Sequence, residues 1–152
     1  MELWELMARE RCRDTLAKYT HAGDRFQLDE FVSAFSLDGI LEIRGSAPLV
    51  GRAAILERFR GGIGHSASPS ESQSAAGAKR IVRHNVTNVH FESLTREEAT
   101  VASYFTVFTN VGADHMGRYR DRLVPVGDEW LIAHRFVSTD WHAPNSLFGA
   151  DA

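Results

Sequence analysis

Histidine side chains are the groups of this 152-residue chain that could move protons near neutral pH. His84 lies in a segment rich in valine, threonine and asparagine, which is typical of a strand. Alternate residues of a strand share a face, so His84, Asn88 and His90 should point the same way as Val82 and Val86. Such a face is either a pocket lining or a partly solvated sheet surface. A histidine on it is a core or rim residue unless a partner gives it a chemical role.

Other chemistries find little support in the sequence. His84 and His90 are separated by about 20 Å along an extended strand, so one metal ion could not bind both. Asp114 and His115 fall at a predicted turn, where we expect them to be solvated. The glycine-rich stretch 61–64 lacks the lysine of a phosphate-binding loop, and no GxSxG nucleophile motif occurs. We therefore predict neither a metal nor a cofactor.

Helical patterns occupy the first part of the chain and must position these groups. The first 23 residues place apolar side chains at helical spacing, and Gly23 should end that helix. A second, short helix is expected from Leu28 to Phe35, and a third over residues 51–59, with a strand at 39–45 between them.

The second part of the chain has the pattern of long strands, at about 80–92, 98–110, 115–126 and 129–140. Hairpin-length turns join them, so neighbours should run antiparallel. Helices followed by a strand meander predict an α+β fold. The serine-rich and glycine-rich stretch 61–78 is expected to be a mobile loop that could act as a lid, and residues 143–152 a loose tail.

Composition and charge indicate one globular domain over residues 1–152. The chain is 43% hydrophobic and 24% charged, with a net charge of −3 and one cysteine, Cys12. No basic run suits nucleic acid, no apolar stretch reaches the roughly 18 residues of a membrane span, and no signal peptide opens the chain. We expect a cytoplasmic protein that binds neither nucleic acid nor membrane.

Short motifs in a particular order resemble the SnoaL-like branch of the nuclear transport factor-like superfamily, across about residues 8–141. They are Tyr19, Ala22-Gly23-Asp24, Gly51-Arg52-Ala53-Ala54-Ile55, Arg83-His84-Asn85-Val86-Thr87-Asn88, Gly117-Arg118-Tyr119-Arg120-Asp121 and Trp130-Leu131-Ile132-Ala133-His134-Arg135. The resemblance implies a cone-shaped roll, with the N-terminal helices packed on a strongly curved, mostly antiparallel sheet around a deep apolar pocket. Scytalone dehydratase, bile acid dehydratase, hexachlorocyclohexane dehydrochlorinase, ketosteroid isomerase and polyketide cyclases share this architecture.

The resemblance also implies a catalytic dyad. Asp24 and His84 fall where the dehydratases and the dehydrochlorinase pair an aspartate with a histidine, and Tyr19 and Arg135 fall near pocket residues of the same relatives. A carboxylate on one imidazole nitrogen fixes the tautomer and stabilises the imidazolium that forms. We expect Asp24 to orient His84, His84 to remove a proton and Tyr19 to donate to a developing oxygen.

Substrate contacts are expected from Arg135 and Asn88, and from Tyr119, which shares strand parity with Gly117. Residues 104–109 carry neither the second histidine nor the second aspartate that some relatives place there. The resemblance therefore implies a cofactor-free lyase or isomerase that acts on a hydrophobic cyclic molecule through a single dyad. Alternatives are a polyketide cyclase, and a non-catalytic ligand-binding protein or scaffold like the small subunit of ring-hydroxylating dioxygenases. Relatives assemble through the sheet, so we expect a homodimer or homotrimer.

Overall fold

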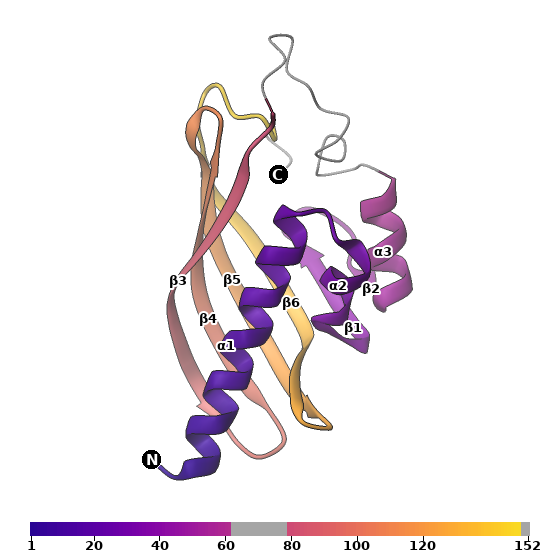
Figure 1. Cartoon of the computed structure of the whole chain (residues 1–152), viewed down its shortest axis with the longest axis vertical. Coiled ribbons are helices and arrows are strands. Elements are labelled where there is room, and N and C mark those ends of the chain that lie inside the picture. Colours follow the sequence, from indigo (N-terminus) through magenta and orange to yellow (C-terminus); the bar gives the residue numbers. More distant parts are fainter. Residues whose placement is uncertain (62–78, 150–152) are drawn as a thin grey trace.

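A computed structural model describes residues 1–61 and 79–149, and in it a long helix lies along one face of a curved sheet (Figure 1). That helix, α1 (Leu3–Asp24), is followed by α2 (Leu28–Ser33) and, after two strands, by α3 (Arg52–Arg60). The buried face of α1 includes Ala8, Cys12, Leu16 and Tyr19, as their spacing predicts. In the described part of the chain, no helix is both long and apolar enough to cross a membrane.

The sheet has six strands in the order β2-β1-β6-β5-β4-β3. Their bounds are β1 (Phe35–Ile43), β2 (Leu49–Val50), β3 (Val82–Leu94), β4 (Ala99–Thr109), β5 (Gly112–Val126) and β6 (Glu129–His142). All neighbours are antiparallel except β1 and β6, which pair in parallel. The predicted α+β cone is confirmed, and its helices cover the inner, concave face of the sheet.

Gly117 shows how tightly the middle of the sheet is bent. A Cβ atom there would lie 2.1 Å from the carbonyl oxygen of Ser138 and 2.8 Å from the ring of Phe105, its cross-strand neighbour on β4. No side chain larger than hydrogen fits without moving the backbone of β6. The glycine therefore allows the strands to approach closely while the Phe105 ring covers it.

Single extra residues interrupt the strand ladders at three places that matter for the site. The pairing shifts by one residue at Asn88 in β3, at Asp114 in β5 and at Asp140 in β6. Asn88 has a positive φ of 53°, which an asparagine tolerates better than most residues. Each such bulge turns the side chains beyond it to the opposite face from the one that strict alternation predicts.

Four local expectations need correction or lie outside the described residues. Phe35 begins β1 instead of ending α2, and α1 continues through Gly23 to Asp24. The mobile loop was expected at 61–78, and residues 62–78 are outside the described residues. Residues 143–149 are not a loose tail, because they return to the sheet and bind the carboxylate of Asp114.

Candidate functional site

Asp24 and His84 meet at the end of the cone where α1 stops and β3 starts (Figure 1). Oδ1 of Asp24 lies 2.5 Å from Nδ1 of His84, and Oδ2 accepts the backbone N–H of His84 at 2.9 Å. Both carboxylate oxygens thus bind the same residue, 60 positions away in sequence. A carboxylate can only accept, so Nδ1 carries the ring proton and Nε2 carries the lone pair of the neutral imidazole. The side chains are 9% and 14% exposed, which leaves the pair shielded but reachable.

The position of Asp24 runs against local preference. It is the last residue of α1, where the helix dipole is negative and a carboxylate costs about 0.3 to 1 kcal/mol instead of contributing stability. The next turn contains Phe26, whose φ of 57° is unusual for an aromatic residue. Local rules broken in this way are typical of functional sites. The two bonds to His84 compensate for the unfavourable position.

An arginine–aspartate ion pair, Arg135 with Asp121, lies deeper under α1. Nε and Nη2 of Arg135 each donate at 2.7 Å to a different oxygen of Asp121, and neither side chain is exposed. The guanidinium carbon lies 4.2 Å from the ring centre of Tyr19 and 3.9 Å from that of Tyr119. Arg135 is thus held between two tyrosine rings, and its remaining nitrogen, Nη1, is buried with no hydrogen-bond partner among the described residues.

The tyrosines are neutral hydrogen-bond donors in this setting. Burial raises the pKa of Tyr19 although the charge of Arg135 opposes the shift. Burial also raises the pKa of Tyr119 well above its ordinary value, and Tyr19 and Asp24 add to the shift. The effect of Asp24 indicates that Tyr119 lies within electrostatic range of the dyad. Tyr119 also stacks on Phe105 at 4.6 Å, so its ring is fixed in place.

Asn88 does not accompany His84. Alternation holds through His84 and Val86, but the bulge at Asn88 turns that side chain out, and both Asn88 and His90 are exposed. The prediction that they share the face of His84 is wrong, and the inward positions beyond the bulge belong to Val89 and Phe91. Asn88 has no place in the site.

A second histidine–aspartate pair was missed at the sequence level. Asp114 and His115 were expected to be solvated, but they are 0% and 5% exposed, and Oδ1 of Asp114 lies 2.7 Å from Nδ1 of His115. They belong to β5 and not to a turn, and the bulge at Asp114 directs both side chains inward. The hairpin signal at 112–114 placed them wrongly. β5 begins at Gly112, three residues before the predicted start, and this extension places Asp114 in the sheet.

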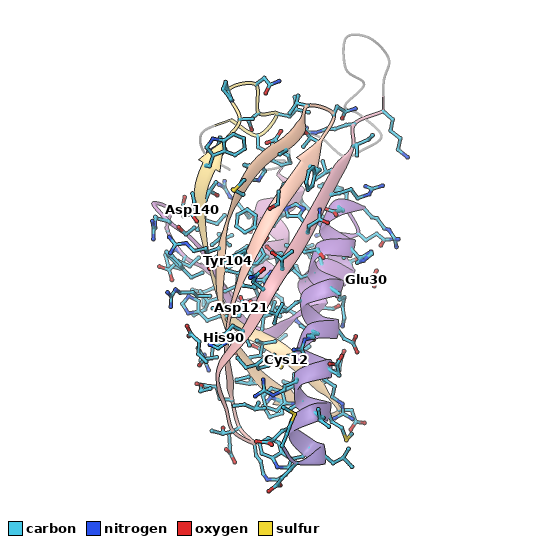
Figure 2. All side chains as sticks on the ribbon, turned by 90° about the vertical axis from the view of Figure 1, so that its left-hand side faces the viewer. Cys12, Glu30, His90, Tyr104, Asp121 and Asp140 are labelled. Carbon is cyan, nitrogen blue, oxygen red and sulfur yellow. The ribbon has the colours of Figure 1, made fainter. Side chains whose placement is uncertain are left out.

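Neither a cysteine nucleophile nor a metal site is supported within the described residues. Burial raises the pKa of the Cys12 thiol to about 12, so it is not a nucleophile, and Figure 2 labels Cys12 in the middle of α1. Within residues 1–61 and 79–149, no three histidine, cysteine, aspartate or glutamate side chains gather as a metal site.

Residues 4–136 match the family of SnoaL-like domains. No curated protein matches the chain. Among solved structures, LinA is 16% identical, with a TM-score of 0.72 over 92% of this chain and 90% of the other. A proposed scytalone dehydratase from Novosphingobium aromaticivorans is 20% identical, with a TM-score of 0.66 over 93% and 87%. A proposed aromatic ring hydroxylase from the same organism is 19% identical, with a TM-score of 0.69 over 90% and 91%. These likenesses show the fold.

Proposed function

The chain belongs to the SnoaL-like domain family, and from that premise we propose that it is a cofactor-free lyase or isomerase of the dehydratase type. Its substrate is a hydrophobic cyclic molecule with a removable C–H proton. The observation that carries the proposal is the contact of Asp24 with Nδ1 of His84, the arrangement in which a carboxylate orients an imidazole base. The presence of a dehydratase-like and a LinA-like fold among the structural neighbours supports the same class of reaction.

In the proposed reaction, Nε2 of His84 takes a proton from a ring carbon, and the C–H electron pair becomes the new C=C bond. The leaving hydroxide takes a proton from the phenol of Tyr19 and departs as water. The imidazolium of His84 then returns its proton to the tyrosinate through solvent, which restores both groups. Asp24 stabilises the imidazolium meanwhile, and general base catalysis of this kind contributes on the order of 10² to 10⁴ in rate.

Arg135 and Tyr119 are proposed to bind an oxygen of the substrate. Nε and Nη2 of Arg135 each donate to Asp121, whereas Nη1 donates to no described residue and is the nitrogen we assign to a ligand. The negative charge of Asp121 raises the pKa of Arg135, although burial alone would lower it, so the guanidinium stays charged. Such a fixed donor stabilises negative charge that develops on an enolate oxygen. The deep pocket that the resemblance implies stays a prediction.

The test begins with proton exchange, because exchange detects the base before the natural substrate is known. Hydroxylated and halogenated cyclic compounds, including cyclic ketones, are incubated in D₂O and examined by NMR for deuterium uptake and for elimination. His84→Ala and Asp24→Asn should reduce either reaction by roughly 10² to 10⁴-fold. His90→Ala, at an exposed histidine of the same strand, is the control and should keep full activity. Wild-type rates in both dyad variants would show that the mechanism is wrong.

Exposed apolar side chains on the outer face of the sheet support the scaffold alternative. Four large apolar side chains lie on the outer face of the sheet, each at least 40% exposed: Tyr104, Phe108, Met116 and Trp141. Met116 and Trp141 are direct cross-strand partners, and Figure 2 shows Tyr104 on the strands that face the viewer. We propose that this outer patch joins copies of the chain as a homodimer or homotrimer, because exposed apolar patches of this kind mark interaction sites.

Sedimentation measures the oligomeric state and so tests whether the outer patch joins copies of the chain. Tyr104→Lys combined with Trp141→Lys should convert an oligomer to a monomer and leave His84 chemistry measurable. A monomeric wild type would contradict the assembly. An oligomer in which His84→Ala changes no activity on any compound would favour the scaffold function over the lyase or isomerase.

A further inference from the structure

Four residues lie in one row across the inner face of the sheet, at the end of the cone that holds the dyad. Direct cross-strand pairing joins His84 on β3 to Val107 on β4, Val107 to His115 on β5, and His115 to His142 on β6. Side chains at paired positions point to the same face. Three imidazoles therefore share one row, interrupted only by the buried side chain of Val107.

Asp114 fixes the orientation and the protonation of His115. Burial alone would raise the pKa of Asp114, but hydrogen bonds outweigh it and lower that pKa to about 2. The four donors are Ser146 Oγ at 2.6 Å, Leu147 N at 2.9 Å, His115 Nδ1 at 2.7 Å and Thr109 Oγ1 at 2.9 Å. Because the carboxylate is ionised, Nδ1 of His115 carries the proton. Burial lowers the pKa of His115, although Asp114 opposes the shift, so the ring is neutral at pH 7 and Nε2 is an acceptor.

That acceptor has no hydrogen-bond partner among the residues that the structure describes. Neighbouring rings surround His115: Phe105 edge-on at 6.1 Å, Phe148 at 4.9 Å and His142 stacked at 5.6 Å. Nε2 of His142, in the ring stacked on His115, is buried with no partner in the described part of the chain. A buried polar atom left unpaired costs about 1 to 3 kcal/mol, so this nitrogen, beside the unbonded acceptor of His115, favours an external partner at the cluster.

The cluster is close enough to the dyad to share one ligand with it. His84 and His115 are two strands apart, which separates their backbones by about 10 Å. His84 is also among the groups that depress the pKa of His115, which places the two rings within electrostatic range of each other. Both side chains project from the same concave face of the sheet. The span between them suits a ligand of about two fused rings.

We propose that Nε2 of His115 accepts a hydrogen bond from a hydroxyl group at the far end of the same cyclic ligand whose C–H bond faces His84. This inference rests on the proposed function, because it takes that ligand as the occupant of the cone. His115 is then a specificity residue that contacts the ligand, and Asp114 is a positioning residue that holds the imidazole through Nδ1. Val107, between them, supplies the apolar floor under the rings. The ligand class narrows to hydroxylated bicyclic molecules.

Binding, without turnover, tests this assignment. The probes are 2-naphthol and its methyl ether, 2-methoxynaphthalene, which differ only in the ability to donate a hydrogen bond. Calorimetric titration of the wild type should show a preference for 2-naphthol of about threefold to tenfold, the value of one net hydrogen bond. His115→Phe keeps an aromatic ring in the same space and should bind both compounds equally. His115→Gln retains an acceptor and should restore part of the preference.

A control separates this inference from the proposed mechanism. His84→Phe should lose exchange and turnover but keep the preference for 2-naphthol, because its substitution lies at the other end of the row. In the wild type labelled with ¹⁵N-histidine, the Nε2 signal of His115 should move with 2-naphthol and not with the ether, which requires no variant to fold.

Some outcomes would overturn the inference. These are equal binding of both probes by the wild type, no binding of either, a preference that persists in folded His115→Phe, and an unmoved Nε2 signal. Dyad variants that keep full turnover while His115→Phe loses the preference would instead refute the proposed mechanism and leave the hydroxyl contact in place.

Discussion

The two inward histidine–aspartate pairs use the same atoms in different ways. Asp24 gives both oxygens to one residue, His84, and comes from a different element 60 positions away. Asp114 is the immediate neighbour of His115 and divides its charge among four donors, two of which belong to residues 146 and 147. A carboxylate that binds only one imidazole can stabilise the positive charge which that ring gains when it takes a proton. A carboxylate shared among four bonds fixes geometry, so under the proposed function the first pair performs the chemistry and the second is an anchor.

The largest expected difference between the pairs is in turnover. On any substrate that the exchange screen finds, Asp24→Asn should lower kcat by roughly 10² to 10⁴-fold, because the imidazolium loses its counter-charge and its tautomer is no longer fixed. Asp114→Asn should lower kcat by less than about tenfold and act mainly on KM through His115. Steady-state kinetics measure both. Equal losses of kcat would remove the distinction.

Stability should show the opposite order. Asp114→Asn replaces an acceptor of four hydrogen bonds by an amide that opposes some of them, so we expect the free energy of unfolding to fall by about 2 to 4 kcal/mol. Asp24→Asn affects two bonds at a partly exposed end of a helix, and should cost about 1 to 2 kcal/mol. Urea titration followed by circular dichroism gives both values. A larger cost at Asp24 would reverse the assignment of the anchoring role.

Protonation of Asp114 at acid pH should lower the free energy of unfolding. The pKa of Asp114 is lowered from 3.8 to about 2 in the folded state. A lowered folded pKa contributes stability above the unfolded pKa, and this stability is lost as pH falls through the folded value. Roughly 2 kcal/mol should therefore disappear between about pH 4 and pH 2. Unfolding of the wild type and of Asp114→Asn at several pH values isolates this contribution. Parallel curves for the two proteins in that interval would contradict it.

The smallest effect on stability is expected at an exposed histidine–carboxylate pair, which serves as the reference for the two inner pairs. His134 and Glu42 form a third histidine–carboxylate pair at 2.8 Å on the outer face, with side chains 37% and 33% exposed. His134→Gln should change the free energy of unfolding by less than about 1 kcal/mol, because water and salt screen such pairs. It should leave exchange and turnover unchanged. A cost like that of Asp114→Asn would mean that burial is not what distinguishes the inner pairs.

How far the sequence predicted this molecule depends on whether local periodicity held. The helical face of Ala8, Cys12, Leu16 and Tyr19 and the four long strands were predictable, because burial follows the 3.6-residue and two-residue periods there. The resemblance paired Asp24 with His84, and the geometry brings them together. Strand alternation failed at Asn88, where no residue pattern marks the bulge.

The second pair was unpredictable for a related reason. Gly112 and Asp114 carry the composition of a hairpin, and it is the pairing of β5 with β4 and the returning residues 143–149 that bury Asp114 and His115. The partner of Asp121 was also not readable from spacing, since Arg118, Arg120 and Arg122 are nearer in sequence while Arg135 lies on the adjacent strand. Contacts between residues far apart in the sequence determine both the burial of the Asp114–His115 pair and the partner of Asp121.

The extra residues at Asn88, Asp114 and Asp140 decide which side chains of their strands face the inside of the cone. Beyond Asp140, a regular strand would place Trp141 inside and His142 outside, the reverse of what is observed. Deletion of a single residue at one of these positions would therefore exchange the inward and outward side chains along the rest of that strand. It would change what lines the inner face of the sheet without any substitution of the lining residues themselves.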